Sequence, residues 1–134
     1  LVQIKQEFIE EMVAHAKADL PNECCGILAG YDGHVVKLYR MTNVEHSSSR
    51  YKMDPGELYQ TYREIDDSGW DLLAIYHSHT HSEAYPSATD VRLATWPDAY
   101  YILVSLLSKE RPSLRAFHIV DGVISEEGLQ TIEG

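Results

Sequence analysis

Two histidines placed two residues apart begin the part of this sequence best suited to chemistry. His77 and His79 follow the apolar run 72–75, which predicts a buried strand. Residues two apart on a strand face the same side, so both imidazoles are expected on one face at the end of that strand. Imidazole is a preferred ligand of zinc. A lone buried histidine is more often a hydrogen-bonded core residue, and a pair on one strand face weakens that alternative.

A catalytic zinc site needs a third protein ligand and keeps its fourth position open for water. Asp90 lies in the first turn of a predicted short helix, from which its carboxylate can reach back to the imidazoles. A local alternative is helix capping, because Ser87 is a good N-cap and Asp90 three residues later completes a capping box. The residues alone leave both interpretations open. His81 falls in a predicted loop, and we do not expect it to bind the metal.

The spacing of these residues forms one pattern. His77-x-His79, seven residues, Ser87, two residues and Asp90 resembles the JAMM motif of the MPN-domain metalloproteases at every fixed position. That motif also includes an upstream glutamate, and Glu23, just before a predicted buried strand, matches it. The alternative for Glu23 is a solvated residue in a turn between helix and strand.

The resemblance extends over most of the chain, from about Phe8 to Val120. The segment 21–26 looks like the glutamate segment of the small bacterial JAMM peptidases, and Asn43 with the segment 50–55 looks like the loop and strand that follow it. The resemblance implies an α/β (α+β) fold: one JAMM/MPN domain over residues 1–134, with a curved mixed β-sheet flanked by helices. This architecture is similar to that of the cytidine deaminases.

The resemblance also implies a role for each matched residue. His77, His79 and Asp90 would bind one zinc ion, which lowers the pKa of water towards 7. Glu23 would take the proton from that water and pass it to the leaving amine. Ser87 would stabilise the oxyanion, and we expect that role to compete with helix capping, because one hydroxyl does not readily donate to two acceptors.

The substrate is implied by the resemblance and not by the spacing. Relatives of this compact kind are similar to peptidases that act on ubiquitin-like sulfur-carrier proteins and cut after the C-terminal Gly-Gly. A flexible tail of small residues suits an extended groove, where it can add to a sheet edge. The polar segment Thr42 to Met53 is our candidate for one wall of that groove, with Arg50 and Tyr51 as test positions.

Three other interpretations compete with a carrier-specific peptidase. A catalytically silent MPN-type scaffold is disfavoured because no residue of the motif is missing. A zinc deaminase needs a Cys-x-x-Cys sequence, whereas the two cysteines here, Cys24 and Cys25, are adjacent. A general ubiquitin-type isopeptidase would use the same chemistry on another partner, and the sequence does not separate it from the preferred interpretation.

The composition excludes further classes of function. The formal net charge is −10, from 11 Lys and Arg against 21 Asp and Glu, which argues against nucleic-acid binding. We expect neither a secretion signal nor a membrane-spanning helix, since the apolar runs are short. Adjacent cysteines cannot close a loop with a disulfide, so Cys24 and Cys25 are expected reduced, in the cytoplasm, and used for packing. Adjacent strand residues face opposite sides, so one metal would not readily bind both.

The rest of the sequence predicts the helices and strands that must position these residues. Asp54 and Pro55 are a cap and a first position typical of a helix start. Asp32-Gly33 and Asp121-Gly122 are signals for tight turns between strands. Strands interleaved with helices indicate an α/β or α+β fold. We predict helices over 6–20, 55–67 and 88–95, and strands over 24–30, 34–41, 51–53, 71–78, 100–107, 114–120 and 123–124.

Overall fold

The computed structural model describes residues 1–133, so Gly134, the last residue of the expected domain 1–134, lies outside the described part. The helices are α1 (Gln6–Ala18), α2 (Pro55–Asp67) and α3 (Ala88–Leu93). The strands are β1 (Val2–Lys5), β2 (Cys25–Tyr31), β3 (His34–Met41), β4 (Asp71–His79), β5 (Tyr100–Ser105), β6 (Ser113–Val120), β7 (Val123–Glu127) and β8 (Leu129–Ile132).

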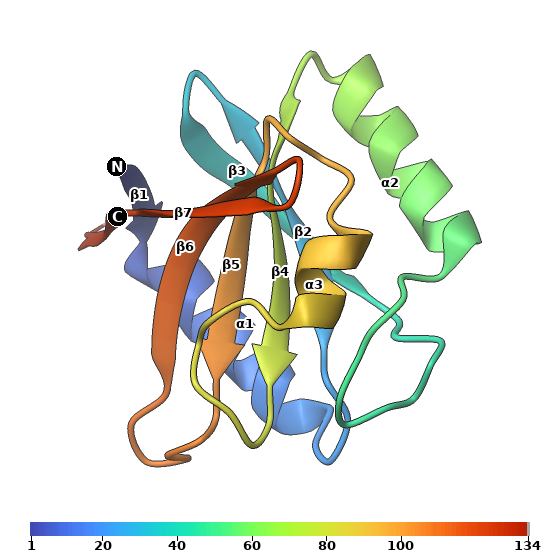
Figure 1. Ribbon diagram of the computed structural model, residues 1–134. Helices are drawn as coiled ribbons and strands as arrows, with labels where there is room; N and C mark the ends of the chain where they lie inside the picture. Colours follow the sequence, from blue (N-terminus) through green and yellow to red (C-terminus); the bar gives the residue numbers. More distant parts are fainter. Residues whose placement is uncertain (134) are drawn as a thin grey trace.

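Six of these strands form one curved mixed sheet in the order β3-β2-β4-β5-β6-β7 (Figure 1). β4 and β5 pair in parallel, whereas the other neighbours in this sheet are antiparallel. The central strands β2 and β4 are almost wholly buried, as expected for strands covered on both faces. The predicted α/β class, with a mixed sheet flanked by helices, is confirmed.

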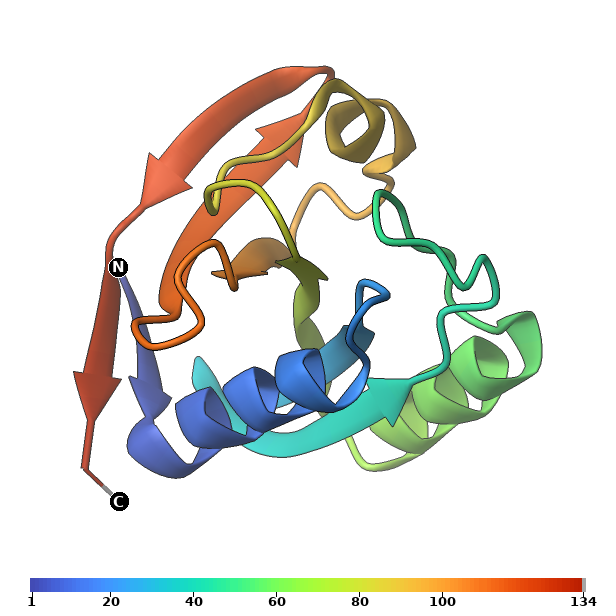
Figure 2. The ribbon, with the colours of Figure 1, turned by 90° about the horizontal axis from the view of Figure 1, so that it is seen from below.

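Alternate residues of the central strands supply two separate cores, because successive side chains point to opposite faces. On one face, Cys24, Leu28 and Tyr76 pack with α1, which lies along the curved sheet (Figure 2). On the other face, Cys25 and Ile75 belong to a core that also receives side chains of α2 and α3. The two cysteines therefore lie in different cores, as predicted, and both are free thiols.

The parallel pairing of β4 with β5 determines the path of the chain after His79. Parallel neighbours need a crossover that returns along the length of the strand. Here residues 80–99 make that crossover, and α3 lies within it over the face of the sheet that α1 does not cover (Figure 1). The crossover thereby brings the first turn of α3 back over the end of β4.

Local signals placed several element boundaries correctly. Both residues of the turns Asp32-Gly33 and Asp121-Gly122 have positive φ, of 52° and 79° and of 51° and 79°, which is the geometry of a tight two-residue hairpin turn. The side chain of Asp54 accepts a hydrogen bond from the Glu57 N–H and caps α2. These features confirm the predicted hairpins and the predicted start of the second helix.

Several details differ from the prediction. The predicted helix 88–95 ends at Leu93, the predicted strand 100–107 ends at Ser105, and the strand predicted at 123–124 extends to Glu127. α1 ends at Ala18, not at residue 20, because the residue before a proline, Leu20, is disfavoured in helical geometry. The predicted strand 51–53 is reduced to one isolated bridge between Asn43 and Met53. β1 and β8 were not predicted and pair in parallel as a separate two-stranded sheet. No helix within residues 1–133 has the length and apolar character needed to cross a membrane.

A glycine within the central strand pair leaves room for a tyrosine that joins α1 to the sheet. Gly26 lies directly opposite Tyr76 in the β2–β4 pair, and the ring of Tyr76 occupies the space that a Cβ on Gly26 would need. The Tyr76 hydroxyl then reaches Nδ1 of His15 on α1 at 2.6 Å, with both side chains buried. Burial lowers the pKa of His15 despite the opposing effect of Asp19, which agrees with a neutral imidazole in this contact.

We predict that Gly26→Ala lowers the free energy of unfolding by at least about 1–3 kcal/mol, because overpacking a filled core displaces side chains and backbone. Gly56→Ala is the matched control. The nearest neighbour of a Cβ there is the Asp54 carboxylate at 3.3 Å, and alanine favours a helix by up to about 1 kcal/mol over glycine. Urea denaturation measures both variants, and equal stabilities would contradict the packing argument.

Candidate active site

The hydrogen-bonded register of β2 and β4 places Glu23 beside the two histidines. Cys25 pairs with His77 in antiparallel register. One step further along, the Cys24 N–H donates to Ser78 Oγ at 2.8 Å and the Ser78 N–H donates to the Cys24 carbonyl at 3.1 Å. Continuing this register sets Glu23 opposite His79. Ser78 faces away from the histidines, because successive strand residues point to opposite faces, and its hydroxyl has this structural role.

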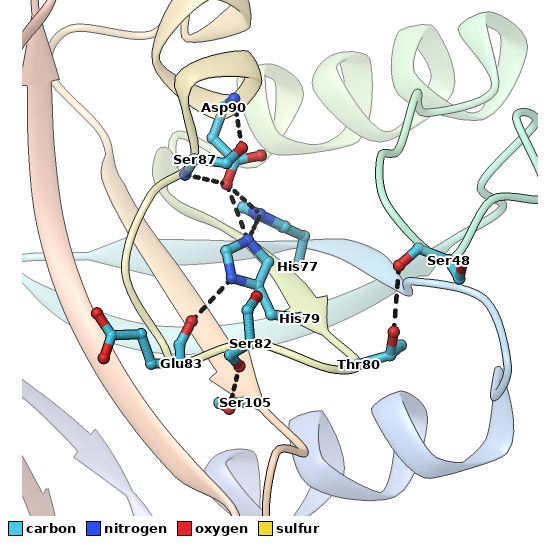
Figure 3. A network of polar contacts seen from close by, with 9 residues as sticks. All are labelled: Ser48, His77, His79, Thr80, Ser82, Glu83, Ser87, Asp90 and Ser105. Atoms are coloured by element: carbon cyan, nitrogen blue, oxygen red, sulfur yellow. Dashed lines mark hydrogen bonds and ion pairs between the residues drawn. The ribbon is translucent and has the colours of Figure 1, made fainter.

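Three side-chain atoms converge at the end of β4 (Figure 3). The Nε2 atoms of His77 and His79 lie 3.3 Å apart. Asp90 Oδ2 lies 3.2 Å from the first and 2.9 Å from the second. All three side chains are buried, with exposed fractions of 1%, 5% and 8%. Within residues 1–133, this is the one group of three or more candidate ligands close enough to hold a metal ion.

The hydrogen bonds of His79 decide which of its nitrogens faces the other two ligands. Nδ1 lies 2.9 Å from the Glu83 carbonyl oxygen, and a carbonyl only accepts, so Nδ1 carries the hydrogen. In neutral His79 the Nε2 lone pair then faces the Asp90 carboxylate. Two acceptors at 2.9 Å repel each other unless a proton or a cation lies between them.

The separations of these atoms fit a metal ion. Ligands about 2.0–2.1 Å from a tetrahedral zinc are about 3.3 Å from one another, close to the observed 2.9–3.3 Å. His77 Nδ1 is buried without a hydrogen-bond partner, whereas the carbonyl of Glu83 orients His79 in the way typical of metal-binding histidines. The donor set of two imidazoles and one carboxylate is one that zinc accepts in catalytic sites.

The pKa values of the three residues follow from burial and from their contacts with one another. Burial lowers the pKa of His77, against the opposing effect of Asp90. Burial has the same effect on His79, but there the hydrogen bonds with Asp90 and the Glu83 carbonyl outweigh it and raise the pKa. Burial also opposes ionisation of Asp90, yet the hydrogen bonds from both histidines hold its pKa well below the usual range. Asp90 is therefore an anion at neutral pH, as a ligand must be.

Glu23 is a buried carboxylic acid next to this group. Its side chain is only 4% exposed, and Oε1 has no hydrogen-bond partner. Burial raises the pKa of Glu23 to about 7, while His79 lowers it and Asp90 raises it. A carboxyl group that titrates near neutral pH is well suited to take and return a proton.

The contacts of Ser87 show that the predicted competition between helix capping and oxyanion stabilisation was wrong. Its Oγ accepts a hydrogen bond from the Asp90 N–H at 3.0 Å, and its own N–H donates to Asp90 Oδ2 at 2.9 Å, so the capping box is formed. Capping uses the hydroxyl oxygen as an acceptor and leaves its hydrogen free. Capping and donation to an oxyanion therefore do not compete. The same box orients Asp90 towards the histidines.

The other candidate residues lie outside the converging group. His81 Nδ1 contacts Thr80 Oγ1 at 2.8 Å, and His81 is exposed, in agreement with its predicted exclusion from the ligands. Burial raises the pKa of the Cys24 thiol to about 12 and that of the Cys25 thiol further. Neither thiol is a thiolate at neutral pH, which agrees with the packing role predicted for both.

Two contacts of the site had no sequence signal. The ring of Tyr51 stacks on His77 with 4.5 Å between ring centroids, and the sequence had suggested Tyr51 only as part of a groove wall. The acceptor for His79 is the main-chain carbonyl of Glu83. Every residue has a carbonyl, so this contact depends on the path of the loop after β4 and is not encoded in a residue type.

The fold and this site together are those of a hydrolase with a candidate metal site. The family model of the prokaryotic homologs of the JAB domain matches residues 5–120. The chain belongs to this family, and the resemblance to the JAMM peptidases is thereby confirmed.

Relatives and solved structures agree with this assignment. The chain is 46% identical over 132 residues to the CysO-cysteine peptidase of Mycobacterium tuberculosis, covering 97% of this chain and 90% of the relative. It is 34% identical over 103 residues to a desampylase of Haloferax volcanii, covering 72% and 74% of the two chains. A JAB1/MPN domain protein of Archaeoglobus fulgidus shares the fold, with a TM-score of 0.68, 20% identity and coverage of 98% and 100%.

We predict that the protein binds one zinc ion. His77→Ala should abolish binding, because the two remaining ligands, His79 and Asp90, are too few to hold the ion. His81→Ala is the control and keeps full zinc content. Metal analysis after dialysis measures stoichiometry, and added zinc should stabilise the wild type by about 2.7 kcal/mol at a hundredfold excess over Kd. Retention of stoichiometric zinc by His77→Ala would rule out this ligand set.

Proposed function

We propose that the protein is a zinc-dependent metallopeptidase that hydrolyses the peptide or amide bond after the C-terminal Gly-Gly of a ubiquitin-like sulfur-carrier protein. The observation that carries the proposal is the convergence of two histidine nitrogens and one carboxylate oxygen within 3.3 Å, beside a buried glutamate with a pKa of about 7. No residue of the motif is missing from the sequence, which disfavours a catalytically silent scaffold.

The residues divide the reaction between them. His77, His79 and Asp90 would hold the zinc, which would supply acidified water and polarise the scissile carbonyl. Glu23 accepts a proton from the attacking water and later protonates the leaving amine. The free hydrogen of the Ser87 hydroxyl donates to the oxyanion of the tetrahedral intermediate.

A groove next to His77 supports an extended tail as substrate. It has a volume of about 490 Å³ and runs between the segment 45–58 and the end of α3. Its lining includes Tyr51, whose ring stacks on His77, so the groove reaches the ring that covers one of the proposed metal ligands. Apolar side chains such as Leu58, Ile75 and Trp96 line much of it, which suits the apolar residues of an otherwise small-residue tail.

The relatives support a carrier adduct as the substrate. The Mycobacterium relative is named a CysO-cysteine peptidase, and a Thermus thermophilus relative is named a probable TtuB-protein conjugate cleaving protease. We propose that this chain likewise releases an amino acid or a protein from a carrier. We also propose that residues 1–134 act as one domain in the cytoplasm, a compartment that suits two free cysteines.

We predict that Glu23→Ala keeps its zinc and loses about 10²–10⁴-fold in turnover, because the proton acceptor is removed and the ligands are not. Mass spectrometry follows cleavage of Gly-Gly-tailed carriers extended by one or more residues. Glu110→Ala, in the exposed β5–β6 loop, is the matched control and should match the wild type. Undiminished turnover by Glu23→Ala would refute this mechanism.

We predict that Tyr51→Ala raises KM about tenfold or more, since burial of an aromatic ring contributes about 1.5–3 kcal/mol. Arg50→Ala should have a smaller effect of a few-fold, as expected for an exposed charge. Lys109→Ala, outside the groove, is the control. If both groove variants cleave every carrier tail like the wild type, this groove does not hold the substrate.

A further inference from the structure

The side chain of Asn43 is the centre of a hydrogen-bond network at the end of β3. It is only 5% exposed. Its Nδ2 donates to the Glu23 carbonyl at 3.0 Å and to the Arg50 carbonyl at 3.1 Å. Its Oδ1 accepts from the N–H groups of Glu45 and Lys52, each at 3.1 Å. An amide has two donor hydrogens and two acceptor lone pairs, so Asn43 uses its full capacity and ties the loop 44–53 to Glu23.

Both main-chain groups of Glu23 are hydrogen-bonded, one to Asn43 and one to the loop 44–53. Its carbonyl accepts from Asn43, and its N–H donates to the Ser47 carbonyl at 2.8 Å. Its side chain has no comparable anchor, because Oε1 is buried without a partner. The position of the carboxylate therefore depends on its main chain, and the main chain depends on the loop.

The same loop contacts the rest of the site. Tyr51 stacks on His77, and the Thr80 hydroxyl, one residue after His79, donates to the Ser48 carbonyl at 3.1 Å (Figure 3). Arg50, Tyr51 and neighbouring loop residues also form one wall of the groove. The loop is thus a single connected segment between the groove, the histidines and Glu23.

We infer that Asn43 is a positioning residue that holds Glu23 in place for proton transfer and links the groove wall to that position. This inference rests on the proposed function in giving Glu23 a proton-transfer role. Asn43 does not touch the reacting atoms, and it acts through the main chain of Glu23. A misplacement of about 1 Å in such a group costs about 10²-fold in rate.

Two substitutions separate this role from simple support of the loop. Asn43→Asp keeps the volume and both acceptor contacts, but it sets a carboxylate oxygen against the carbonyls of Glu23 and Arg50 and replaces both hydrogen bonds by repulsion. Asn43→Ala removes all four hydrogen bonds without the repulsion. Ser49→Ala is the matched control, because in the same loop its exposed hydroxyl contacts only Ser47 Oγ.

The first measurement needs no substrate. Amide hydrogen exchange of the zinc-loaded protein, read by NMR, should show the Glu23 N–H exchanging about tenfold faster or more in Asn43→Ala and Asn43→Asp. The Ser78 N–H, which donates to Cys24, reports whether the sheet is intact and should not change. Ser49→Ala should match the wild type. Unchanged protection of the Glu23 N–H in both Asn43 variants would overturn the inference.

The second measurement is the separation of kcat from KM on the cleaved carrier. Both Asn43 variants should retain zinc and lose about 10–100-fold in kcat, with KM within about threefold of the wild type. Asn43→Asp should be the slower of the two. A higher KM with unchanged kcat would mean that Asn43 supports only the groove, which overturns the inference. If the wild type cleaves no carrier, the proposed substrate fails, whereas the exchange measurement still decides whether Asn43 holds Glu23.

Discussion

The antiparallel register between β2 and β4 is the constraint on which the site depends. Because Cys25 pairs with His77, Glu23 must lie opposite His79 and on the same face as both histidines. A slip of one residue would turn Glu23 towards α1 and away from the imidazoles. The mutual hydrogen bonds between Cys24 and Ser78 extend the register past the end of β2, and the close fit of Tyr76 over Gly26 opposes any shift.

A second constraint is electrostatic. The sheet and its crossover bring a carboxylate and two imidazole nitrogens together with little access to water. The carbonyl of Glu83 turns the lone pair of His79 towards Asp90, so the group requires a positive charge at its centre. The capping box of α3 adds to this requirement for positive charge, because Ser87 keeps Asp90 close to the two imidazoles. Helix capping and the approach of Asp90 to the histidines, which seemed alternatives, occur together in one arrangement.

Much of the fold followed from local patterns. The exceptions below depend on contacts between segments that are distant in the sequence. The turn at Asp32-Gly33 and the helix start at Asp54 depend on residues close in sequence, and both were predicted. β1 and β8 were missed because Val2–Lys5 pairs with Leu129–Ile132 from the opposite end of the chain. The segment 51–53 was predicted as a strand from its composition, but its backbone contacts Asn43 and the ring of Tyr51 covers His77 instead.

The sequence by itself determined the chemistry available to this protein. The types and spacing of His77, His79 and Asp90 specify a candidate metal-binding set, and a glutamate before an apolar strand specifies a candidate base. Only the tertiary structure decided the pKa, the orientation and the position of these groups. The pKa of Glu23 depends on burial, and the lone pair of His79 is oriented by a main-chain carbonyl. The position of Glu23 depends on a loop joined to it through Asn43. Burial and main-chain hydrogen bonds arise only when distant segments pack together, so no local pattern of residues can specify them.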